Sequence, residues 1–197
     1  MKPNEGSGSA TPSGSNAMPS VPLAGEALAK FYVACVARIN AGKLDEYKRD
    51  CIDPDIAVHD VDSDEFTGAD SVVGYLKDMR TAMPDVKLEP QLVVVSGRSI
   101  LAITLITGKQ TGPMKGQKGE LKASDKKIGM LMFHHLKTND ENKTTEEWDY
   151  SDDKTMLGQL GLLDKQLGGT RLPIEKSWPG APIVLVTKDD DKEKANL

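Results

Sequence analysis

Several features that would point to a membrane or nucleic-acid role are scarce in this sequence. No apolar run approaches the roughly 20 residues that a membrane-spanning helix needs. The net charge of −5 leaves no basic excess, and aromatic side chains make up only 5% of the chain. Nucleic acids and anionic membrane surfaces, which attract basic surfaces, are therefore not expected as partners.

Cysteine is equally scarce, since Cys35 and Cys51 are the only two. Their spacing matches no metal-binding motif. Both fall on apolar faces of predicted helices, so two buried free thiols are the first expectation and a disulfide between them is the alternative. No signal-peptide-like apolar segment follows Met1. A cytoplasmic protein is the default expectation, and an exported protein with a processed N-terminus stays open.

The composition divides the chain into one domain with two tails. Residues 1–21 are rich in Gly, Ser and Pro, which predicts a disordered N-terminal tail. Residues 22–163 are long enough for an independent fold. Residues 164–197 form a C-terminal extension that we expect to be partly disordered. Its apolar run at 182–186 is expected to form an edge strand or to rest on a neighbouring molecule.

Hydrophobic periodicity predicts helices first and a sheet afterwards. Helices are expected over 23–41, 44–51 and 69–83, and strands over 56–61, 87–96, 99–109, 128–136 and 144–152. This order indicates an α+β fold, with the helices on one face of a mostly antiparallel sheet. Because the strand over 99–109 is apolar on both faces, we expect a second copy to cover the outer face and form a homodimer.

The hairpin formed by 128–136 and 144–152 carries the most informative side chains. If Thr138 faces Thr144 across the turn, odd residues of one strand meet odd residues of the other, because side chains alternate along strands. One face would then carry an imidazole and two carboxylates among apolar groups, namely Leu131, Phe133, His135, Thr145, Glu147 and Asp149. Burial raises a carboxyl pKa toward neutrality, where proton exchange is useful. A half-exposed hairpin whose acids face water is the alternative.

Two loops invite ligand-binding interpretations that their spacing does not support. The acidic segment 62–65 lacks the glycine and terminal glutamate of a calcium-binding loop, so a solvated bend is expected there. The segment 112–125 combines three glycines with three lysines, but it matches no phosphate-binding fingerprint. A mobile flap at the mouth of a pocket is the expectation for this second loop.

The order of short motifs resembles the SnoaL-like polyketide cyclase family, part of the nuclear transport factor 2-like superfamily. The motifs are Asn40-Ala-Gly-Lys-Leu-Asp45, His59, Thr67-Gly-Ala-Asp70, Arg80-Thr-Ala-Met-Pro-Asp85, Glu146-Glu-Trp-Asp-Tyr-Ser-Asp152 and Gln159-Leu-Gly161. The resemblance implies a cone-shaped, curved sheet with three N-terminal helices on its concave face. It also implies an aspartate that serves as general acid–base for aldol ring closure, with a histidine close by. These positions match Asp149 and His135.

Two functions of different classes follow from these observations. The first is a cofactor-independent, metal-free enzyme of the cyclase, lyase or isomerase kind, with Asp149 and His135 as catalytic residues acting on a hydrophobic carbonyl compound. The second is a non-catalytic protein that holds an apolar ligand in the same cone. Either way, the expected substrate-binding residues are Tyr32, His59, Leu131, Phe133 and Glu147.

Overall fold

A computed structural model describes residues 21–60, 65–116, 119–163 and 182–187. Its helices are α1 (Gly25–Asn40), α2 (Leu44–Cys51), α3 (Ala69–Ala82) and α4 (Asp153–Leu160). Its strands are β1 (Ile52–Asp60), β2 (Phe66–Thr67), β3 (Lys87–Ser96), β4 (Ser99–Gln110), β5 (Met114–Gly116), β6 (Gly119–Leu121), β7 (Lys126–Thr138), β8 (Thr144–Ser151) and β9 (Ile183–Val186). The α+β architecture predicted from the sequence is confirmed.

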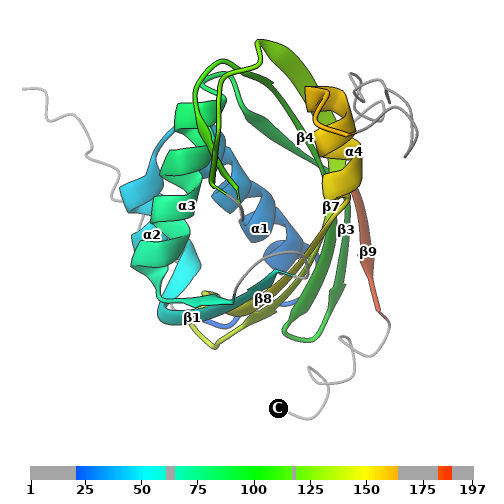
Figure 1. Ribbon diagram of the computed structural model, residues 1–197. Helices are drawn as coiled ribbons and strands as arrows, with labels where there is room; N and C mark the ends of the chain where they lie inside the picture. Colours follow the sequence, from blue (N-terminus) through cyan, green and yellow to red (C-terminus); the bar gives the residue numbers. More distant parts are fainter. Residues whose placement is uncertain (1–20, 61–64, 117–118, 164–181, 188–197) are drawn as a thin grey trace, which may run out of the picture.

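Seven of these strands form one curved sheet in the order β2-β1-β8-β7-β4-β3-β9. Most neighbours are antiparallel, while β1 with β8 and β3 with β9 are parallel. Figure 1 shows α1, α2 and α3 on the concave side of this sheet, with α4 beside β7 at its far end. The long β4–β7 pair lies near the centre of the sheet, and β8 lies on the other side of β7, with which it forms the β7–β8 hairpin.

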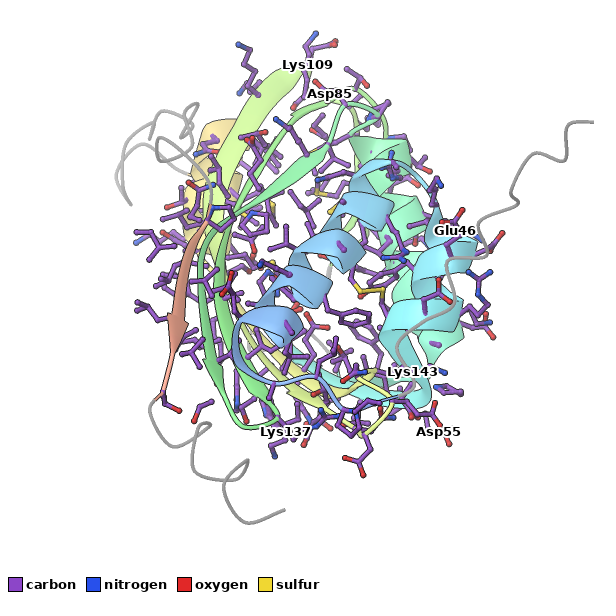
Figure 2. The ribbon with its side chains drawn as sticks, turned by 180° about the vertical axis from the view of Figure 1, so that it is seen from behind. Glu46, Asp55, Asp85, Lys109, Lys137 and Lys143 are labelled. Carbon is purple, nitrogen blue, oxygen red and sulfur yellow. A yellow bond between two sulfur atoms is a disulfide. The ribbon has the colours of Figure 1, made fainter. Side chains whose placement is uncertain are left out.

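The core lies between the helices and the concave face of the sheet. On α1, apolar side chains recur every three or four residues and are buried, namely Leu28, Tyr32, Cys35, Val36 and Ile39. Arg80 of α3 donates from Nη2 to the Asn40 carbonyl oxygen at 2.7 Å, which ties α3 to the end of α1. Figure 2 shows the labelled charged residues, such as Glu46, Lys109 and Lys137, around the outside of the molecule.

Several elements differ in detail from their predicted bounds. The first strand begins at Ile52, directly after α2, rather than at residue 56. The lysine-rich segment holds a short two-stranded hairpin, β5–β6, where a loop was expected. The run near the C-terminus forms the edge strand β9 beside β3, as one of the two alternatives predicted. Residues 61–64, which contain most of the acidic segment, lie outside the described residues.

The expectation of two free thiols is wrong. Cys35 of α1 and Cys51 at the end of α2 form a disulfide, with Cα atoms 5.9 Å apart, and the bond is visible among the side chains in Figure 2. The two helices are joined by a tight turn that brings their apolar faces together, so the two thiols meet. In the described part of the chain, no helix combines the length and hydrophobicity that a membrane crossing requires.

Candidate active site

Three ionisable side chains meet on the concave face of the β7–β8 hairpin. His134 of β7 lies opposite Asp149 of β8, and Glu147 lies two residues before Asp149 on the same face. His134 Nδ1 is 2.7 Å from Asp149 Oδ1 and 3.2 Å from Glu147 Oε1. The three side chains are only 11%, 13% and 14% exposed for His134, Glu147 and Asp149. The hairpin therefore holds an imidazole and two carboxyl groups away from solvent.

A β-bulge decides which histidine joins this cluster. Thr138 does pair with Thr144, but Lys137 pairs with Glu146, so Thr145 is an extra residue on β8. Beyond the bulge, even residues of β7 meet odd residues of β8. The prediction that His135 shares a face with Asp149 is therefore wrong, and His134 takes that place.

The predicted partner, His135, lies on the convex face of the sheet. Its ring stacks on Trp148 with centroids 4.9 Å apart, and His59 stacks on Trp148 as well, at 5.1 Å. Strand alternation puts Leu131 and Phe133 on the same convex face as His135. The structure thus separates these three predicted substrate-binding residues, His59, Leu131 and Phe133, from the acids.

A cavity of about 50 Å³ lies between α1, α2 and the sheet. His134 and Glu147 line it, and so does Tyr32, whose hydroxyl oxygen is 3.4 Å from Thr104 Oγ1. Much of the remaining wall is apolar, with Phe31 of α1 and the Cys35–Cys51 disulfide among its members. Of the predicted substrate-binding residues, Tyr32 and Glu147 are brought together here.

Burial sets the protonation of the cluster. The pKa of Asp149 rises from 3.8 to about 7, first because burial disfavours the carboxylate and then because Glu147 lies close, although His134 opposes the rise. Burial acts against the imidazolium of His134, but Tyr32 and the two carboxyl partners outweigh it and raise its pKa well above the ordinary value. The site can therefore take up and release protons near neutral pH.

Tyrosines from the helices surround the cluster. Burial raises the pKa of Tyr32 and raises that of Tyr47 still further. Tyr75 of α3 is 49% exposed and does not line the cavity. The phenols of Tyr32 and Tyr47 line it and stay protonated at neutral pH, so they can donate hydrogen bonds to a bound molecule.

The same three side chains form the one candidate cation site within the described ranges. One ligand atom each from His134, Glu147 and Asp149 lies within 4.8 Å of the others. One nitrogen and two carboxylate oxygens are a donor set that divalent transition metals accept. Without a metal, His134 Nδ1 contacts one oxygen of each acid directly.

His134 is the functional residue that the sequence analysis missed, although it lies in the predicted hairpin next to His135. His134 and His135 are adjacent, so one of them had to face the helices whatever the register. The choice depended on whether the pairing at Thr138 continued along the strands. The sequence of the turn contains no signal that predicts the bulge at Thr145, because threonine is an ordinary strand residue.

Comparison with known proteins agrees with this fold. The family model described as SnoaL-like polyketide cyclase matches residues 26–160. No curated protein matches the chain by sequence.

Solved structures provide the second comparison. A SnoaL-like polyketide cyclase from Agrobacterium tumefaciens is 16% identical with a TM-score of 0.56, covering 68% of this chain and 98% of its own. IdmH, a candidate polyketide cyclase from Streptomyces antibioticus, is 21% identical with a TM-score of 0.57, covering 68% and 98%. AclR, a candidate hydroxylase from Streptomyces galilaeus, is 21% identical with a TM-score of 0.59, covering 70% and 97%. At these identities the likeness shows a common fold.

Proposed function

The chain belongs to the SnoaL-like polyketide cyclase family, and on that premise we propose that it is an enzyme that performs cofactor-independent acid–base chemistry. The substrate is a hydrophobic carbonyl compound, and the reaction is an intramolecular aldol closure or an isomerisation. The observation that carries this proposal is the buried His134–Glu147–Asp149 cluster, in which the pKa of Asp149 is about 7. A general base is most effective when its pKa lies near the working pH.

We assign a role to each group. Asp149 lies 2.7 Å from His134, a residue of the cavity wall, and removes a proton from the carbon next to the substrate carbonyl. His134 donates a hydrogen bond to Asp149 and, because it lines the cavity, brings positive charge close to the enolate that forms. The apolar wall, which includes Phe31, Ile39 and Leu88, excludes water from the reacting groups.

The test is Asp149→Asn, with Glu146→Gln as the matched control. Glu146 is the neighbouring acid on the same strand, but it pairs with Lys137 at 3.0 Å, away from the cluster. An apolar aryl ketone serves as the probe, and NMR follows exchange of its α-proton for deuterium. We expect Asp149→Asn to abolish exchange without weakening ketone binding or lowering the melting temperature, while Glu146→Gln exchanges normally. Equal exchange in the wild type and Asp149→Asn would refute the proposal.

A non-catalytic ligand-binding protein is the second candidate, and the apolar wall of the cavity favours it. Hydrophobic lining with a few polar groups is typical of binding pockets. In a pure binding protein, the wild type would bind the aryl ketone tightly and leave its α-proton in place. The same NMR experiment therefore separates the two functions.

The convex face of the sheet supports association of two copies. We define the outer-face patch as five side chains that are 43–52% exposed, namely Leu101, Phe133, Tyr150, Ile183 and Leu185. These residues come from β4, β7, β8 and β9, and their pairing registers place them on the face opposite His134. Exposed apolar groups gathered on one sheet face are typical of interaction sites. We propose that this patch is the interface of a homodimer.

The dimer proposal predicts a change in molecular mass in solution. A charge in the middle of the patch, Phe133→Glu, would have to be desolvated at an apolar interface, so it should convert the dimer into a monomer. The control is Leu162→Glu, since Leu162 is also exposed (51%) but lies after α4. Light scattering after size-exclusion chromatography measures the mass. A wild-type protein that is monomeric at all concentrations would rule the interface out.

The disulfide bears on the compartment in which the protein works. Disulfides persist in oxidising compartments and are rare where thiols are kept reduced. The Cys35–Cys51 bond therefore favours the exported alternative over the cytoplasmic default. Fractionation of the producing cells, followed by detection of the protein in each fraction, tests this location.

A further inference from the structure

The phenol of Tyr47 is a buried polar group in the wall of the cavity. Its side chain belongs to α2 and is only 8% exposed. Within the part of the chain that the structure describes, no residue hydrogen-bonds to the Tyr47 hydroxyl. The other tyrosine of the wall differs, since the hydroxyl oxygen of Tyr32 is 3.4 Å from Thr104 Oγ1. Buried polar groups are nearly always hydrogen-bonded, so an unpaired phenol beside a cavity points to a ligand as its partner.

The Tyr47 hydroxyl lies on the side of α2 that faces the acids. Burial raises the pKa of Tyr47 well above its ordinary value, and the negative charges of Glu147 and Asp149 raise it further. Charges act in this way only at short range, so the hydroxyl is close to the cluster. Glu147 lines the same cavity as Tyr47. A molecule that reaches the acids therefore also meets the phenol.

Two links to α1 hold Tyr47 in place. The residue lies four positions before Cys51, and residues four apart share one face of a helix. The disulfide from Cys51 to Cys35 ties this face of α2 to α1. The neighbouring ion pair adds a second link, since Arg38 Nη2 is 3.8 Å from Asp50 Oδ2. A donor that is fixed in advance needs no reorganisation when charge develops on a bound molecule.

Building on the proposed function, we propose that Tyr47 is a further catalytic residue, which donates a hydrogen bond to the substrate's carbonyl oxygen and to the enolate oxygen that forms from it. When Asp149 takes the proton from the neighbouring carbon, the electron pair of that C–H bond forms a C=C bond and the carbonyl π electrons move to the oxygen. Hydrogen bonds to a charged acceptor are stronger than those to a neutral one, so Tyr47 stabilises the enolate more than the ketone. The phenol keeps its proton throughout, and its state is unchanged when the enolate reacts further.

The first experiment detects this hydrogen bond directly. An apolar aryl ketone, labelled with carbon-13 at its carbonyl carbon, is bound to the wild type and to Tyr47→Phe, and NMR records the carbonyl shift. A hydrogen bond to the oxygen moves this shift downfield, so we expect the displacement in the wild type and its loss in Tyr47→Phe. Ketone binding should weaken by roughly 10-fold. The same carbonyl shift in both proteins would overturn the proposal.

The matched control is Tyr75→Phe. It removes the same hydroxyl group from a tyrosine of α3 that is 49% exposed and does not line the cavity. Its carbonyl shift and ketone affinity should equal those of the wild type. An aryl alkane of the same size as the ketone provides a second control, because it offers no acceptor and should bind Tyr47→Phe as tightly as the wild type. Equal weakening of the alkane and the ketone would mean that the substitution damages the cavity wall, and the proposal would be wrong.

Thermal unfolding of the ligand-free protein tests whether the hydroxyl has a structural role instead. Because the Tyr47 hydroxyl has no partner among the described residues, Tyr47→Phe should melt no lower than the wild type. Tyr32→Phe should melt lower, since it loses the contact with Thr104. If Tyr47→Phe melted well below the wild type or failed to fold, the hydroxyl would be holding the fold together and the proposal would be overturned.

The α-proton exchange assay measures the catalytic role. Removal of one donor to an oxyanion lowers turnover by roughly 100-fold, so Tyr47→Phe should lower kcat by about that factor. KM should rise by no more than roughly 10-fold, because the bond is weaker to the neutral ketone. A folded Tyr47→Phe that exchanges at the wild-type rate would refute the catalytic role.

The experiments separate this inference from the function on which it rests. If the wild type exchanges no proton but the carbonyl shift depends on Tyr47, the proposed enzyme falls, while Tyr47 stands as the donor that recognises the carbonyl group of a ligand. If the wild type exchanges and Tyr47→Phe changes neither the carbonyl shift nor the rate, only the present inference falls.

Discussion

The raised pKa of Asp149 predicts that this buried carboxyl group destabilises the fold at alkaline pH. Folding raises its pKa from 3.8 to about 7, so between these values the folded chain binds more protons than the unfolded chain. The free energy of unfolding must then fall as the pH rises through this window. A pKa that moves this far corresponds to roughly 4 kcal/mol, which is the upper limit of the penalty above about pH 7.

His134 acts in the same direction. Its pKa is also raised in the folded state, so the stability that its charge provides is present at low pH and is lost as the pH rises through that folded value. Both groups therefore make the protein less stable in alkali than in mild acid.

Asp149→Asn isolates the contribution of the carboxyl group. An asparagine cannot ionise and can still hydrogen-bond to His134, so the variant should lose most of this pH dependence. We expect it to be more stable than the wild type by up to roughly 4 kcal/mol above pH 7, and similar to it near pH 4. Urea unfolding of both proteins across this range measures the difference. If the free energy of unfolding changed with pH in the same way for both proteins, the pKa of Asp149 would not be raised by folding, and the reasoning would be wrong.

Two more predictions concern the histidines and the disulfide. His134→Gln should lower α-proton exchange by about 100-fold, because it removes the partner of Asp149. His135→Gln should exchange at the wild-type rate, since that ring stacks on Trp148 on the convex face. The same exchange assay compares the two variants, and equal losses of exchange would contradict the strand register. Reduction of the bond between Cys35 and Cys51, which are 16 residues apart, should lower the free energy of unfolding by about 3 kcal/mol. Urea titrations with reductant and without it measure this difference. Equal stability in the two titrations would mean that the thiols are free.

The sequence predicted the sheet and helices well because their signals are local. The apolar stripe from Leu28 to Ile39 defines α1 by itself, and the apolar run over 99–109 defines the strand β4. Asp152 precedes α4 and accepts a hydrogen bond from the Thr155 backbone N–H at 3.0 Å, a cap that an aspartate at this position favours. Such features need no knowledge of distant contacts.

The candidate site was harder because it depends on register. The face of Glu147 and Asp149 follows from alternation along one strand, and these two acids do lie together. The histidine depends on pairing between two strands, where one inserted residue reverses the faces. The disulfide likewise depends on how closely α1 and α2 pack. Both failures concern distances between elements, which periodicity within an element does not contain.

The extra residue at Thr145 decides which side chains of β8 face the helices. If β8 paired with β7 without the bulge, Thr145 would lie opposite Lys137, and every later residue of β8 would shift by one position. Trp148 and Glu146 would then point at the helices, and the two acids would face outward. Deletion of Thr145 would leave Lys137 opposite Glu146 and the acids inside, whereas a single codon inserted between Glu146 and Glu147 would turn them out of the interior.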